Sequence, residues 1–171
     1  EYAALGRFPE CEAVAPEQGT PRIGIRSYTV LPRNRPRLRQ ALVTTGSPIA
    51  VAVDATNWGL YKAGVYSDID IAQAGEFTVN HVATLVGYHA KDPYKDDDYA
   101  YYHIKNSWGT NFGENGYMRI EIKDGETEHC GWDTNSHMGV ACDGEPNRAW
   151  VCGTNGILFD ASYAVGPFLE H

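Results

Sequence analysis

Two stretches decide the fold of this 171-residue chain: Val79–Tyr88, which reads VNHVATLVGY, and Tyr102–Tyr117, which reads YHIKNSWGTNFGENGY. The first stretch has the alternation of a β-strand and places His81 on the same face as small and apolar residues. Between the two stretches, Lys91–Asp98 contains a proline and three successive aspartates, which is too polar for a buried element. The pattern therefore predicts neighbouring antiparallel strands joined by a charged hairpin loop.

Other elements follow from the same kind of pattern. Ile49–Val53 is a short run of apolar and β-branched residues, typical of a buried strand. Tyr99–Lys105 and Tyr117–Ile122 read as two further strands, the second with clear alternation. A short helix is expected to begin at Pro36 and to end at Gly46. The fold class is thus α+β, dominated by antiparallel strands in a barrel.

The chain is expected to be part of one domain. Residues 1–48 are interpreted as loop and short helix, and residues 49–122 as the strand-rich barrel. Residues 123–155 form a polar, glycine-rich loop in this interpretation, and residues 156–171 a final strand and tail, with strand character at 156–165.

Charge and composition exclude two classes of partner. The formal net charge is −8, so the basic surface needed for nucleic acid is missing. No apolar run approaches the roughly 18 residues of a membrane-spanning helix. We therefore expect a soluble protein with neither nucleic acid nor membrane as partner.

The histidine segment, together with KNSWGT at 105–110 and GENGY at 113–117, resembles the papain-like cysteine peptidases, the cathepsin family. The resemblance implies hydrolysis of peptide bonds through a thioester, with His81 and Asn106 as catalytic residues. A histidine can stabilise a thiolate and then protonate the leaving amine, and a neutral amide can hold the imidazole in place. Outside this motif, His81 would be interpreted as a core histidine and Asn106 as a turn residue.

The same resemblance assigns six residues to the substrate cleft or its walls: Ala52, Val79, Asn80, Val82, Trp108 and Phe112. Val79 and Ala52 would line an apolar pocket for the side chain second before the scissile bond, favouring Val, Leu or Phe there. Trp108 would shield the contact between the catalytic pair from water. Phe112 stands where the family has a second tryptophan, so stacking is kept and the indole donor is lost.

The nucleophile of the family is a cysteine in a Cys-Gly-Ser-Cys-Trp type motif, about 130–150 residues before the histidine. None of the cysteines of this chain lies in such a motif. We therefore expect the nucleophile, and the glutamine that stabilises the oxyanion, on an absent upstream segment or on a light chain; the helical first third of the fold is not in this sequence. Two alternatives stay open: an inactive homologue that acts as a binding or scaffold protein, and a zymogen-derived or inhibitor-bound fragment with a regulatory use.

Four cysteines are disulfide candidates: Cys11, Cys130, Cys142 and Cys152. The resemblance implies that Cys11 tethers the absent segment, and an internal bridge is expected within residues 130–152. A zinc site that combines the three later cysteines with His129 and His137 is the alternative, but no Cys-x-x-Cys pair supports it. We expect no metal and no cofactor.

The family resemblance also implies the partners and the location. The expected partners are peptide or protein substrates and protein inhibitors of cysteine peptidases. The expected location is a lysosome, a vacuole or the secretory space, where disulfides persist.

Overall fold

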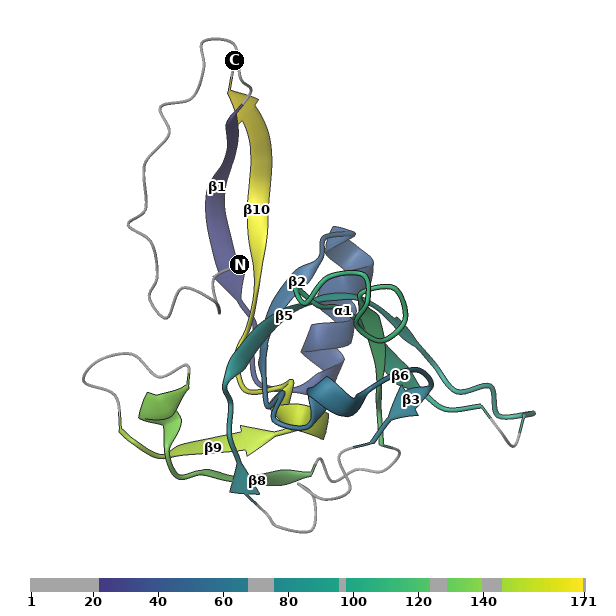
Figure 1. Cartoon of the computed structure of the whole chain (residues 1–171). Helices are drawn as coiled ribbons and strands as arrows, with labels where there is room; N and C mark the ends of the chain where they lie inside the picture. Colours follow the sequence, from purple (N-terminus) through teal and green to yellow (C-terminus); the bar gives the residue numbers. More distant parts are fainter. Residues whose placement is uncertain (1–21, 68–75, 96–97, 124–128, 140–145, 171) are drawn as a thin grey trace.

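The computed structural model describes residues 22–67, 76–95, 98–123, 129–139 and 146–170. In this part of the chain, two β-sheets are accompanied by a single α-helix (Figure 1). The larger sheet has seven strands in the order β1-β10-β2-β5-β6-β7-β3, and the smaller has three in the order β4-β8-β9. The structure is therefore mostly β, as the sequence predicts.

Most neighbouring strands are antiparallel, and the exceptions are the parallel pairs β3–β7 and β4–β8. The strands are β1 Arg22–Val30, β2 Ile49–Val53, β3 Val65–Tyr66, β4 Glu76–Phe77, β5 His81–His89, β6 Tyr101–Lys105, β7 Tyr117–Glu121, β8 Cys130–Asp133, β9 Ala149–Cys152 and β10 Ala161–Glu170.

Helix α1, Arg35–Thr45, begins and ends where local chemistry requires. The side chain of Asn34 accepts a hydrogen bond from the backbone N–H of Arg37 at 3.0 Å, which caps the first turn. Gly46 has a φ of 60°, the left-handed conformation that commonly follows the last helical residue. The predicted helix is therefore present, one residue longer at its start than expected.

The main core lies between α1 and the central strands. Alternate residues of β5, β6 and β7 point inward, and α1 contributes Leu38 and Ala41. The largest fully buried side chains of this core are Trp58, Leu38, Ile49, Leu85, Ile104, Met118, Ile120, Ile157, Val51 and Val53. This packing fixes the central strands and hence the residues at their ends.

Four strands differ from the sequence prediction. β1 lies within the predicted loop, and it pairs with β10 along its length in a ribbon that extends from the body of the fold (Figure 1). β10 begins at Ala161 and reaches Glu170, whereas strand character was expected at 156–165. The predicted loop at 123–155 contains β8 and β9. These strands are short or exposed on both faces, so burial leaves little alternation for sequence analysis to detect.

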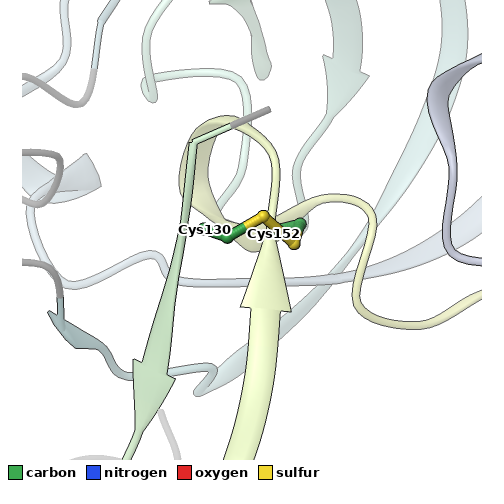
Figure 2. The surroundings of a disulfide bond; sticks show 2 residues. All are labelled: Cys130 and Cys152. Carbon is green, nitrogen blue, oxygen red and sulfur yellow. A yellow bond between two sulfur atoms is a disulfide. The ribbon is translucent and has the colours of Figure 1, made fainter. Parts of the chain in front are cut away.

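A disulfide joins Cys130 of β8 to Cys152 of β9 (Figure 2). The two residues are also direct partners in the β8–β9 ladder. The internal bridge expected within residues 130–152 is therefore present. It joins two cysteines that are 22 positions apart in the sequence. Cys11 and Cys142 lie outside the described residues.

An ion pair holds the glycine-rich turn before β7. Arg119 donates to both carboxylate oxygens of Glu114, which also accepts the N–H of Gly64 at 3.0 Å. The hydrogen bond from Arg119 is the largest cause of a lowered pKa of Glu114, about 2 instead of 4.5. The ionised carboxylate therefore links two segments that are 50 residues apart.

Glu114→Gln is expected to lower the stability of the full-length protein at pH 7 by about 1–2 kcal/mol. Because the folded-state pKa lies below the ordinary one, the carboxylate stabilises the fold above about pH 4.5, and this stabilisation is lost as the pH falls towards 2. Urea unfolding at pH 7 and pH 3 measures the effect, with Glu121→Gln as a control on β7. An equal deficit of Glu114→Gln at both pH values would contradict this account.

Candidate active site

His81 and Asn106 lie at the ends of two paired strands. β5 begins at His81, and Asn106 follows the last residue of β6. The last pair of the β5–β6 ladder is Thr84 with Lys105. His81 and Asn106 both lie just beyond that pair, at the same end of the two strands, where their side chains reach each other.

The two side chains form a hydrogen bond. Nε2 of His81 lies 2.9 Å from Oδ1 of Asn106. The same oxygen accepts the backbone N–H of Ser107 at 2.8 Å, which orients the amide with its oxygen towards the ring. Because Oδ1 can only accept, Nε2 carries a proton in this contact. Among the described residues, Nδ1 makes no hydrogen bond and is free to face a reacting group.

Two aromatic rings lie against His81. The Trp108 ring centroid lies 5.2 Å from that of His81, and Trp108 is 44% exposed. Trp58, in the 3-10 turn Trp58–Leu60, is fully buried. Its ring packs edge-on against that of His81, with 5.9 Å between the ring centroids. Trp58 is not among the predicted site residues; its place after the β2 strand is the one signal that could have suggested this contact.

Phe112 packs 5.1 Å from Trp108 and also contacts Tyr61. It is only 9% exposed, so it supports the Trp108 ring from within the core. The structure therefore places Phe112 behind the predicted wall and leaves little of its surface for a ligand.

A groove of about 520 Å³ adjoins the pair. Its lining residues are Pro48, Val82, Ala83, Thr84, Val86, Lys105, Asn106, Ser107 and Tyr117. Val82 is 56% exposed and Val86 36%, so the outward face of β5 is apolar beside Asn106. The groove therefore has space for another group next to Asn106.

The other predicted cleft residues occupy different environments. Ala52 and Val79 are 5% and 1% exposed and pack with Phe77 and Val151 in a second, smaller core. The side chain of Asn80 accepts the N–H of Ala55 at 3.0 Å and donates to Thr56. Val82 is thus far more exposed than Val79 and Ala52, the two residues predicted to line the pocket.

The remaining histidines of the strands have structural contacts. Nε2 of His89 lies 2.8 Å from a carboxylate oxygen of Asp98 on the charged hairpin. The ring of His103 packs against that of Tyr117, with 5.1 Å between the ring centroids. In the described part of the chain, no three His, Cys, Asp or Glu side chains are grouped to hold a metal ion. The zinc alternative also loses two ligands, because Cys130 and Cys152 are bonded to each other.

Comparisons with known proteins agree with the fold. The family described as "Papain family cysteine protease" matches residues 1–140. Cathepsin J of Mus musculus is 34% identical over 77% of this chain and 41% of its own length, and falcipain-3 of Plasmodium falciparum is 33% identical over 81% and 27%. The chain spans between 26% and 41% of the length of the curated relatives that it matches here.

Solved structures give the same assignment. The bromelain protease from Ananas comosus, in complex with the inhibitor E64, has a TM-score of 0.54 and 28% identity, and covers 82% of this chain and 50% of its own. Digestive procathepsin L 3 of the Tenebrio molitor larval midgut has a TM-score of 0.54 and 26% identity, with coverage of 83% and 36%. No helix among the described residues has the length and apolar character to cross a membrane.

Fold and comparisons together define the class as the β-rich part of a papain-like fold. The chain belongs to the papain family of cysteine proteases.

Asn106→Ala is expected to release the His81 ring, because it removes the acceptor of Nε2–H. The neutral ring should then populate both tautomers, which ¹⁵N NMR of the labelled full-length protein would detect. Asn111→Ala, in the exposed turn after Trp108, is the control. Unchanged ¹⁵N shifts of His81 in Asn106→Ala would refute the proposed orientation.

Proposed function

We propose that this chain supplies the histidine and asparagine of a papain-like cysteine endopeptidase. The observation that carries the proposal is the 2.9 Å contact between Nε2 of His81 and Oδ1 of Asn106, with Nδ1 free among the described residues. An imidazole held at one nitrogen and open at the other can exchange a proton with a thiol. Membership of the papain family supports the same chemistry.

The nucleophile in this proposal is a cysteine outside the present sequence, on an upstream segment of the same chain or on a light chain. Of the four cysteines here, Cys130 and Cys152 are consumed in the disulfide. The part of the groove around Val86, which is exposed, is where the segment that carries the cysteine would pack.

The proposed reaction is acyl transfer. The thiol gives its proton to Nδ1 of His81, and the thiolate attacks the peptide carbonyl carbon to form a C–S bond. The Nδ1–H then protonates the leaving nitrogen as the C–N bond breaks, which leaves a thioester. Nδ1 next takes a proton from water, whose hydroxide attacks the thioester and releases the thiolate. The oxyanion of each step is stabilised by the absent segment.

Asn106 keeps the ring in the orientation that these steps need. Its amide is neutral, so it holds Nε2–H without offsetting the positive charge that the imidazolium presents to the thiolate. The Trp108 and Trp58 rings exclude water from part of this hydrogen bond and so increase its strength.

Substrates in this proposal are peptides or proteins with an apolar side chain second before the scissile bond. Val82 is the exposed contact for such a side chain, with Val79 and Ala52 as the buried layer behind it. Asn80 and Trp108 would border the cleft on either side of His81. Protein inhibitors of cysteine peptidases would bind the same cleft.

A lysosomal, vacuolar or secreted location is part of the proposal. The Cys130–Cys152 disulfide supports it, because structural disulfides persist in oxidising compartments.

Labelling of the full-length protein with the epoxide E-64, followed by mapping of the modified peptide, tests where the nucleophile lies. The expected result is one modified cysteine outside residues 1–171. Prior reaction with a vinyl sulfone should block labelling of that cysteine by E-64. Absence of label would favour the inactive homologue, a binding or scaffold protein, over the peptidase. Label on Cys11 or Cys142 would show that the assigned nucleophile is wrong.

Substitution of the two site residues tests their separate roles. His81→Ala should lower kcat by roughly 10⁴-fold or more, since it removes the proton carrier. Asn106→Ala should lower it by roughly 10- to 100-fold, since the ring remains but is less well oriented. Steady-state hydrolysis of a peptide amide gives both values, with His89→Ala as the control histidine. Small and equal losses at both positions would contradict the assigned roles.

A further inference from the structure

The turn 133–139, which begins at the end of β8, lies against the backbone that leads into His81. Asp133 is 1% exposed, and its Oδ2 accepts the N–H of Val79 at 3.0 Å. Its Oδ1 accepts the N–H of Asn135 at 2.9 Å within the turn itself. Val79 precedes His81 by two residues. We propose that Asp133 is a positioning residue: through Val79, it sets the place of His81 and of the pocket wall.

A buried carboxylate is stable only when its oxygens accept strong hydrogen bonds. Asp133 satisfies this requirement with two backbone N–H groups, so its position is fixed by the chain on both sides. The preceding N–H, that of Thr78, donates at 2.8 Å to Asp54, a second buried carboxylate. The following N–H, that of Asn80, donates to the carbonyl of Val53 at 3.1 Å.

Three consecutive N–H groups before His81 are therefore held by side chains or backbone of other segments. Asp54 and Val53 come from the end of β2 in the large sheet, which also pairs with His81 itself. Asp133 is the contact among these that comes from the small sheet. The peptide of Val79 is thus held between the two sheets.

Gly139 holds the same peptide from its carbonyl side. A Cβ atom at position 139 would lie 1.9 Å from the carbonyl oxygen of Val79, closer than any contact allows. The backbone at 139 therefore rests directly on Val79, and a side chain there would displace it. Asp133 and Gly139 are the two ends of one turn, and they contact the N–H and the C=O of one residue.

The turn has its own anchors, so it can act as a fixed support. The hydroxyl of Ser136, which is 2% exposed, donates to the carbonyl of Pro146 at 3.0 Å. The N–H of His137 donates to the side chain of Asn147 at 2.9 Å. The Cys130–Cys152 disulfide joins the two strands that bear these segments (Figure 2).

This inference rests on the proposed function for its kinetic consequences. A shift of Val79 would move the imidazole relative to the nucleophile and would change the apolar wall behind Val82. Loss of Asp133 should therefore lower kcat through His81, and should raise KM most for substrates with a large side chain second before the scissile bond.

The test uses four variants of the full-length protein. Asp133→Ala removes both acceptors. Asp133→Asn keeps the shape of the side chain but has only one oxygen acceptor. Its NH₂ group would face a backbone N–H, and two donors cannot form a hydrogen bond. Gly139→Ala adds one methyl group on the opposite side of Val79 and removes no hydrogen bond. Asp160→Asn is the control, since it makes the same change of charge at an exposed carboxylate.

Three measurements are made on each variant: the His81 ring signals by NMR, kcat and KM for substrates with Leu or Ala at the second position, and Tm. In Asp133→Ala and Gly139→Ala, we expect shifted His81 signals and a kcat/KM about 10- to 100-fold lower. Asp133→Asn should lie between these and the wild type, and Asp160→Asn should match the wild type.

Lower Tm with unchanged His81 signals and unchanged kcat would overturn the positioning role, because the carboxylate would then be only structural. Failure of both Asp133 variants to fold would overturn it in the same way. The NMR measurement requires no activity. A wild type that E-64 does not label would defeat the proposed function, while the His81 signals would still decide the role of Asp133.

Discussion

The site depends on the antiparallel pairing of β5 with β6. The register that pairs Thr84 with Lys105 brings two residues that are 25 positions apart to one face and one end of the sheet. A register slip of one residue would turn His81 away from Asn106, because side chains alternate between faces. The buried alternate residues of β5 and β6, Leu85 and Ile104 among them, oppose such a slip by keeping the apolar face on the core.

The core near the site is rich in aromatic rings. Trp58, buried behind His81, and Trp108, partly exposed beside it, enclose the imidazole between two rings. Phe112 supports Trp108 from within. Each ring buries a large apolar area, which stabilises the fold. The rings also leave one edge of the histidine open, so the same residues stabilise the core and allow a reacting group to approach.

The small sheet adds a second constraint from the opposite direction. β8 and β9 are only four residues long each, and they are joined by the Cys130–Cys152 bond. A sheet of this size buries little by itself, so the crosslink contributes by limiting the unfolded chain. What it presents to the rest of the molecule is a buried carboxylate, Asp133, which accepts the N–H of Val79, two residues before the histidine that the large sheet carries.

The sequence by itself determined helix α1, the central strands β2, β5, β6 and β7, and the candidate residues His81 and Asn106. The periodicity of β5, the proline and glycine at the two ends of α1, and the block around Asn106 are local signals, so they can be detected without coordinates. Only the tertiary structure decided the contacts of Trp58, the burial of Val79 and Phe112, and the hydrogen bond of Asp133 to a residue 54 positions away. Such contacts depend on how separate segments pack, and a short strand or a lone aspartate has no periodic pattern that indicates its partner.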